Sequence, residues 1–116
     1  MHIEAFSFGS ITIGGKTYDH DVVIDRGSVR RRDKKPSKEL ERRFGHTPLS
    51  IAEKIPWDCR RLVVGTGAHG RLPVSEEVVE EAKQRDVELV MKPTPQVMDE
   101  QQTFGDETNA ILHVTC

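Results

Sequence analysis

The most constraining feature of the sequence is a strand, helix, strand pattern over residues 61–91. RLVVG is a continuous apolar run of strand length, which is typical of a strand covered on both faces. Ser75 then precedes EEVVEEAKQR, and VELVM follows as a second strand, Val87 to Met91. A helix between two strands predicts that the strands run parallel, joined by a right-handed crossover. The predicted helix turns one apolar face to the sheet, formed by Val78, Val79 and Ala82.

A second pattern, near the amino terminus, predicts a β-hairpin. Apolar residues alternate on both sides of Gly14-Gly15, and two glycines supply the positive φ angles of a tight turn. We expect the second strand of this hairpin to extend to Ile24. His20 is then a core residue on its apolar face, and Asp19 and Asp21 lie on the solvated side.

Shorter signals complete the predicted fold. Ser37 is typical of a helix start, with Gly45 as its end, and Thr47-Pro48 begins another short helix that ends at Pro56. Thr94-Pro95 opens a third. AILHVT, Ala110 to Thr115, predicts a final strand in the interior of the sheet. Together these elements predict the α/β class.

Composition limits the function classes. A chain of 116 residues, with 35% hydrophobic and 31% charged residues, predicts one globular domain over 1–116. No apolar run reaches the ~18 residues that cross a bilayer, and the first residues do not resemble a signal peptide. Two cysteines, Cys59 and Cys116, favour free thiols in a reducing compartment. We therefore expect a cytoplasmic protein without membrane contact.

Charge is distributed unevenly along the chain. Residues 1–61 carry 13 basic and 9 acidic side chains, and residues 62–116 carry 4 and 10. The basic excess includes RRRDKK, Arg30 to Lys35, which we interpret as a solvated loop; contact with an anion or a partner is the alternative. Aromatic residues make up only 5% of the chain, so the sequence does not favour nucleic-acid binding.

GTGAHG, residues 65–70, has the G-x-G-x-x-G spacing of dinucleotide-binding loops. In such sites the glycines join a strand directly to a helix whose amino terminus faces the pyrophosphate. Here the helix cap waits until Ser75, which leaves all three glycines in a loop. The second strand is also followed by Lys92 instead of an acidic residue. The sequence therefore favours a structural turn and predicts no dinucleotide cofactor.

The same loop is nevertheless a candidate site for a small anion. Consecutive backbone N–H groups in a glycine-rich loop can form a concave anion nest, and three side chains there could add to it. The candidate ligand-binding residues are Gly65, Thr66, Gly67, His69, Gly70 and Arg71.

Other chemical candidates are weaker. Cys116 is a conceivable nucleophile with His113 or His69 as base, but His113 and Cys116 point to opposite faces of a regular strand. No pair of histidines or cysteines has the close spacing of a zinc site. We therefore predict no catalytic residue, no metal and no cofactor.

Five motifs in order, FGSITIGG, DHDVVI, GHTPLS, VVGTG and LHVTC, resemble a small, widespread single-domain family of largely unknown function, the Mth938-like domain. The family includes the mitochondrial complex I assembly factor three and the adipogenesis-associated protein. The resemblance covers nearly the whole chain and implies a three-layer α/β fold around a central mixed sheet. It implies no reaction.

Two functions remain open at this point. The first is a non-enzymatic binding or assembly-assisting domain with protein partners, which the resemblance favours. The second is a small-anion or metabolite-binding protein, or an enzyme, that uses the loop from Gly65 to Arg71. A concave pocket at this loop would favour the second.

Overall fold

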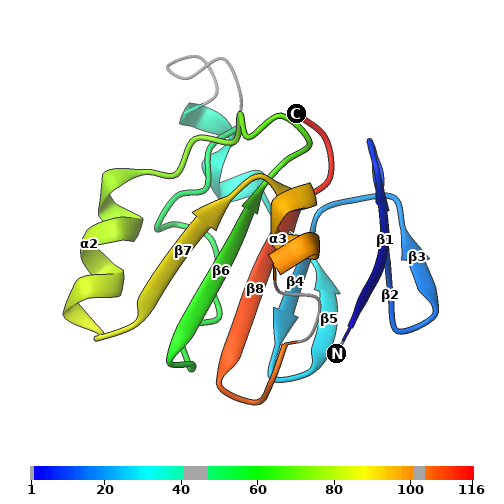
Figure 1. Ribbon diagram of the computed structural model, residues 1–116. Coiled ribbons are helices and arrows are strands. Elements are labelled where there is room, and N and C mark those ends of the chain that lie inside the picture. Colours follow the sequence, from blue (N-terminus) through cyan, green and yellow to red (C-terminus); the bar gives the residue numbers. More distant parts are fainter. Residues whose placement is uncertain (1, 41–46, 101–103) are drawn as a thin grey trace.

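The computed structural model describes residues 2–40, 47–100 and 104–116. Its centre is a five-stranded sheet in the order β5-β4-β8-β6-β7 (Figure 1). β6 pairs in parallel with β7 and β8, whereas β4 is antiparallel to β5 and β8, so the sheet is mixed as predicted. The strands are β4 (Val22–Asp25), β5 (Ser28–Arg31), β6 (Arg61–Thr66), β7 (Glu88–Lys92) and β8 (Thr108–His113).

The strand, helix, strand unit is confirmed. Helix α2 (Glu76–Gln84) follows the N-cap residue Ser75, whose backbone is extended, and connects the parallel strands β6 and β7. Val78 and Ala82 are 0% and 2% exposed, as expected for the face that packs on the sheet. The strand predicted at residues 110–115 is β8, and it lies between β6 and β4 inside the sheet.

Two apolar layers cover the two faces of the central sheet. Along β6, Leu62 and Val64 belong to the layer that includes α2, and Val63 belongs to the layer on the other side. This alternation follows from the two-residue period of a strand. Helix α3 (Thr94–Glu100) and the amino-terminal strands cover the second face, which gives the expected three-layer fold (Figure 1).

The amino-terminal hairpin is confirmed, but it belongs to a separate three-stranded sheet. Strands β1 (Ile3–Ser7), β2 (Ser10–Ile13) and β3 (Lys16–Tyr18) pair in sequence order, and Gly14 and Gly15 form the turn with φ of 58° and 80°. The prediction that one strand continues to Ile24 is wrong. The chain bends at residues 19 and 20, because Val22 to Ile24 are buried on both faces and pair within the central sheet.

The short helices are confirmed in part. α3 begins at Thr94 as predicted, and a 3-10 helix, η1, spans Lys35–Leu40. Ser37 lies inside η1 and is fully buried, so it is not a cap; the predicted end at Gly45 falls outside the described residues. The helix predicted from Thr47 is wrong. Its backbone bonds elsewhere, because the Leu49 N–H donates to the Pro73 carbonyl oxygen at 2.8 Å.

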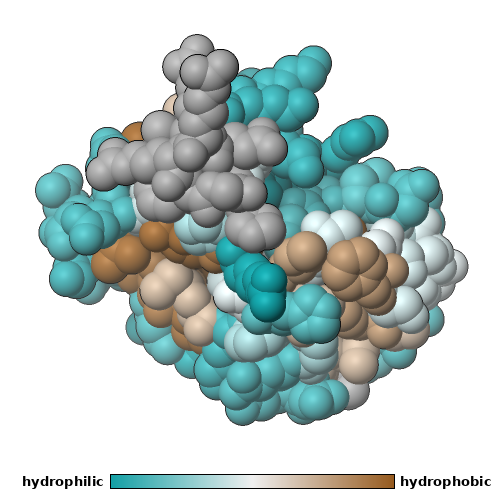
Figure 2. All heavy atoms as spheres, turned by 90° about the horizontal axis from the view of Figure 1, so that it is seen from above, coloured by the Kyte–Doolittle hydropathy of each residue, from teal (hydrophilic) through white to brown (hydrophobic). Residues whose placement is uncertain are grey.

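Figure 2 views the end of the sheet at which the parallel strands finish. Hydrophilic residues cover much of this face, and hydrophobic residues gather in separate patches.

Among the helices of the described residues, none combines the length and the apolar composition needed to cross a bilayer. Cys59 and Cys116 are both free thiols, as predicted.

Candidate functional site

The glycine motif lies at the carboxyl end of β6. Gly65 and Thr66 are the last residues of that strand and are buried, so the prediction that all three glycines lie in a loop is wrong for Gly65. The loop proper runs over residues 67–71, and α2 begins only at Glu76, as the cap signal predicted. The amino terminus of the helix therefore does not follow the glycines directly.

Residues from the carboxyl-terminal part of the chain occupy the amide groups of this loop. The Ala68 N–H donates to the Thr115 carbonyl oxygen at 2.6 Å, and the Arg71 N–H donates to Cys116 O at 2.9 Å. The Gly67 N–H donates to the Thr94 hydroxyl at 3.0 Å. Backbone donors that would form an anion nest are thus bound within the chain, and the loop acts as a docking strip for residues 115 and 116.

Gly67 shows why this strip needs glycine. Its φ is +101°, a conformation that side chains disfavour, and a Cβ built there would lie 2.4 Å from the carbonyl carbon of Cys116 and 2.7 Å from Cδ2 of His113. Two backbone segments approach each other too closely for any side chain. The glycine spacing therefore has a structural explanation.

The side chains of the predicted loop site differ in exposure. Thr66 is 8% exposed, whereas His69 and Arg71 are exposed, and the His69 ring lies 6.2 Å from that of Phe8. These contacts do not test whether an anion binds at the loop, so the loop site stays a prediction.

A different group of polar side chains lies at the same end of the sheet. Residue 22 of β4 pairs with Leu112 of β8 and with Arg31 of β5. This register brings Asp21, which precedes β4, beside Arg32, which follows β5, and beside His113 at the end of β8. Asp21 and Arg32 are only 8% and 5% exposed.

Arg32 is the centre of this buried network. Its guanidinium donates to both carboxylate oxygens of Glu53 at 2.8 and 2.9 Å, to Asp21 Oδ2 at 2.9 Å and to the Pro48 carbonyl oxygen at 3.1 Å. The Ser37 hydroxyl donates to Glu53 at 2.6 Å. Two carboxylates and a carbonyl thus surround one arginine, which is the arrangement that a buried charge needs. These contacts raise the pKa of Arg32 against the opposing effect of burial.

Asp21 connects this network to β8. Its Oδ2 lies 2.8 Å from Nδ1 of His113, and its Oδ1 accepts the Val114 N–H at 2.9 Å. Burial alone would raise the pKa of Asp21, but the His113 hydrogen bond and charge, the Val114 amide and Arg32 together lower it from 3.8 to about 2. Asp21 is therefore ionised and accepts hydrogen bonds only.

A pocket of about 650 Å³ lies over this network. Asp21, Arg32 and Thr115 form part of its wall, and its rim carries six exposed charged side chains. Among these, the basic residues form no ion pair with any residue that the structure describes. The rim residues are Arg31, Lys34, Lys35 and Lys38, with Asp19 and Asp33.

The prediction that the RRRDKK run is a solvated loop is therefore wrong for its first half. Arg30 and Arg31 belong to β5, and Arg32 is buried. Asp21 is likewise buried and not on a solvated side. The sequence contains a signal for strand β5 in Val29, the apolar residue that follows the Arg26-Gly27 turn. A turn followed by alternating polar and apolar residues indicates a strand that returns antiparallel to the one before it.

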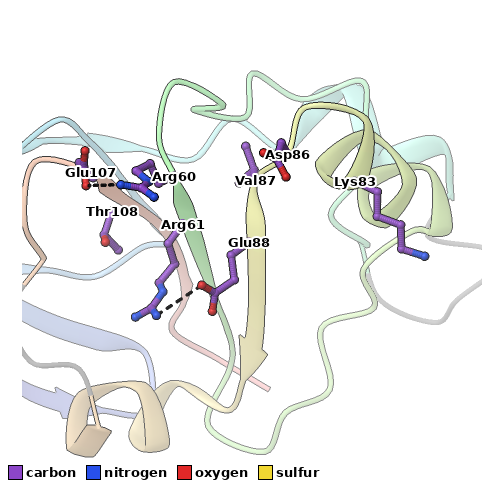
Figure 3. Close-up of a pocket in the computed structure, with 8 residues that line it drawn as sticks. All are labelled: Arg60, Arg61, Lys83, Asp86, Val87, Glu88, Glu107 and Thr108. Atoms are coloured by element: carbon purple, nitrogen blue, oxygen red, sulfur yellow. Dashed lines mark hydrogen bonds and ion pairs between the residues drawn. The ribbon is translucent and has the colours of Figure 1, made fainter.

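A second cavity, of about 720 Å³, lies at the opposite end of the sheet (Figure 3). Four of its charged side chains form ion pairs with one another: Arg60 lies 3.6 Å from Glu107, and Arg61 lies 3.4 Å from Glu88. Three basic and three acidic residues line it, so this cavity has no preference for either sign of charge. The pocket over Arg32 is the better candidate site.

Metal chemistry has no visible centre here. Within the ranges 2–40, 47–100 and 104–116, no three histidine, cysteine, aspartate or glutamate side chains are grouped to hold an ion.

Comparison with known proteins gives the family. A family model described as a protein of unknown function (DUF498/DUF598) matches residues 3–102. The chain belongs to this family. Conserved hypothetical protein PH1505 from Pyrococcus horikoshii OT3 is 33% identical, with 100% of both chains covered and a TM-score of 0.80. A solved structure named MT938 is 25% identical over 99% of this chain and 98% of its own, with a TM-score of 0.69.

No curated protein matches the chain. The DUF498/DUF598 assignment and the MT938 match confirm the small family of unknown function and the Mth938-like fold that the five motifs predicted. The relationship to the complex I assembly factor three and to the adipogenesis-associated protein stays an expectation. Function must therefore be argued from the site itself.

Proposed function

We propose that this chain is a binding domain whose ligand is a small anion, held in the pocket over Arg32. The observation that carries the proposal is the charge of the rim, which has four exposed basic side chains and two acidic ones. The basic side chains have no ion-pair partner among the described residues. Unpaired cations around a concavity attract anions and raise their local concentration.

The wall below the rim supports the same proposal. Arg32 and Asp21 are held by several hydrogen bonds each, so the pocket rests on a rigid base. A volume of about 650 Å³ falls in the range of small-molecule sites. Carboxylate and phosphate groups are the anions that lysine and arginine side chains recognise best. The predicted anion class is retained, but the proposed site differs from the glycine loop.

A protein partner, the ligand class that the sequence favoured, has its own support. Phe8 and Met91 are 60% and 45% exposed, and the burial of exposed apolar surface drives most protein association. In an assembly-assisting role, such a partner would bind outside the basic pocket.

Free Cys59 and Cys116 support a cytoplasmic location.

Calorimetric titration with inorganic phosphate tests the anion proposal. The test variant replaces Lys34, Lys35 and Lys38 with Gln, and the control variant replaces Lys16, Lys54 and Lys83, which are exposed elsewhere. Both variants lose the same net charge, so a general charge effect would weaken them equally. We expect the pocket variant alone to lose at least about tenfold in affinity, equivalent to about 1.4 kcal/mol. Equal affinities for the two variants would refute the proposed site.

A further inference from the structure

We propose that Thr115 and His113 form a nucleophile and base, oriented by Asp21, that transfers an acyl group from an anionic carboxylic ester bound in the basic pocket. The inference rests on the proposed anion site and adds a reaction to it.

The geometry is that of a relay from carboxylate to imidazole to hydroxyl. Asp21 Oδ2 lies 2.8 Å from His113 Nδ1, and His113 Nε2 lies 3.2 Å from the Thr115 hydroxyl. These contacts have the order and the roles of the triads that activate serine hydroxyls and cysteine thiols on unrelated folds. His113 is the last residue of β8 and Thr115 follows two residues later, and the hydrogen bond between their side chains shows that they lie on the same side of the chain.

Three donors fix the orientation of the carboxylate. Asp21 accepts from Arg32, from the Val114 N–H and from the His113 ring. Because an ionised carboxylate only accepts, the ring carries its proton on Nδ1. In its neutral form, which is the form that acts as a base, the ring presents the Nε2 lone pair to the Thr115 hydroxyl. Asp21 is thus a positioning residue, whereas His113 and Thr115 would contact the reacting atoms.

Access distinguishes Thr115 from the other hydroxyls near the network. Thr115 lines the pocket, and the His113 side chain behind it is only 12% exposed. Ser37 and Ser50 are buried and hydrogen-bond each other, and Ser37 also donates to Glu53, without a histidine. The Thr94 hydroxyl accepts a hydrogen bond from the Gly67 N–H and donates its proton to the His113 carbonyl oxygen, so its proton is directed at the backbone and not at the His113 ring.

The reaction balances with water as the second substrate. The Thr115 oxygen forms a bond to the ester carbonyl carbon while its proton moves to His113 Nε2. The carbon–oxygen bond to the alcohol breaks, and His113 returns the proton to the leaving oxygen. Water, deprotonated by His113, then attacks the acyl-threonine. The bond from the acyl carbon to the Thr115 oxygen breaks, His113 returns the proton to that oxygen, and the acid is released. The cationic side chains of the rim would stabilise the negative charge that develops on the ester carbonyl oxygen.

The test measures acylation by mono-4-nitrophenyl succinate, an anionic ester, in a Cys116→Ala background that removes the neighbouring thiol. Nitrophenolate release gives the rate, and mass spectrometry of the carboxyl-terminal peptide locates the succinyl group. Thr115→Val removes the hydroxyl and keeps the shape, and Thr115→Ser keeps the hydroxyl. Thr17→Ala is the matched control, because Thr17 bonds Thr12 in the exposed hairpin.

We expect a succinyl group on Thr115, its loss in Thr115→Val, its retention in Thr115→Ser and no effect of Thr17→Ala. With the neutral ester 4-nitrophenyl acetate, the rate that depends on Thr115, measured as the difference between the wild type and Thr115→Val, should be at least about tenfold smaller, since general base catalysis needs the ester held in place. The Nδ1 proton of His113 should give a downfield proton resonance that Asp21→Asn removes, with far-UV circular dichroism confirming that the variant is folded.

An unmodified Thr115, with nitrophenolate release no faster than in Thr115→Val, would refute the triad and leave the proposed function standing if the chain still binds phosphate. An unmodified Thr115 in a chain that does not bind phosphate would refute both. Equal acylation of the wild type and Thr115→Val would assign the reaction to another side chain and also overturn the inference.

Discussion

The Asp21 carboxylate and the His113 ring meet at 2.8 Å although 92 residues separate them in the chain. The contact joins the start of β4 to the end of β8 and lies beneath the basic pocket. It also gives the protein a specific dependence on pH.

The pKa of Asp21 is about 2 in the folded chain and 3.8 in its ordinary range. A carboxylate with a lowered folded pKa stabilises the protein above its unfolded pKa, and this stability is lost as the pH falls through the folded value. We therefore expect the wild type to lose about 2 kcal/mol more than Asp21→Asn between pH 5 and pH 2. Urea unfolding at several pH values measures this difference. A parallel decline in both proteins would contradict the assigned pKa, and Asp19→Asn, at an exposed neighbour, serves as the control.

Removal of Arg32 should be strongly destabilising. Arg32→Met leaves the carboxylates of Asp21 and Glu53 buried without their cation, and the loss of one partner from a buried ion pair costs about 3–5 kcal/mol. Arg31→Ala, on the exposed neighbour, should change the free energy of unfolding by less than about 0.5 kcal/mol. Denaturant titration of the two variants gives both values. Similar stabilities would mean that the network contributes little.

Gly67 should not tolerate a side chain. Its φ is positive, and an added Cβ would lie only 2.4 Å from the carbonyl carbon of Cys116, so we expect Gly67→Ala to lower stability by about 2 kcal/mol or more. Gly105→Ala is the control, because a Cβ there meets nothing within 4 Å. Thermal unfolding compares the two. A Gly67→Ala protein as stable as the wild type would show that residues 115 and 116 do not dock on this loop.

Dinucleotides should not bind to GTGAHG. The loop amides donate within the chain, and α2 starts at Glu76, too late to direct its amino terminus at a pyrophosphate. A ligand at about 100 times its dissociation constant would add about 2.7 kcal/mol and raise the melting temperature by several degrees. We expect no such shift with NAD, NADP or FAD. A saturable shift that Gly67→Val abolishes would overturn this conclusion.

The sequence predicted the central fold because local signals there agree with one another. RLVVG, the cap at Ser75 and VELVM each indicate their element, and the structure contains all three. The helix predicted at Thr47-Pro48 failed because its cap signal is also compatible with an irregular segment. Leu49 there forms a bridge with Val74, a long-range pairing that no local pattern encodes.

The candidate pocket could not be read from the sequence for a related reason. Asp21, Arg32, Glu53 and His113 come from four separate segments, and Arg32 stands in a run of charged residues that suggests solvent exposure. The antiparallel pairing of β4 with both β5 and β8 brings Asp21, Arg32 and His113 together, and Glu53 joins them by binding Arg32. GTGAHG, by contrast, is a contiguous motif, and its glycines reflect close backbone packing.

The most direct test of the anion site is a titration with inorganic phosphate followed by nitrogen–proton correlation NMR. We predict saturable shifts centred on the amides of Arg31 to Lys35, Lys38 and Thr115, around the basic pocket. Shifts confined to the amides of Gly67 to Arg71, or to the charge-balanced cavity around Arg61 and Glu88, would contradict the account.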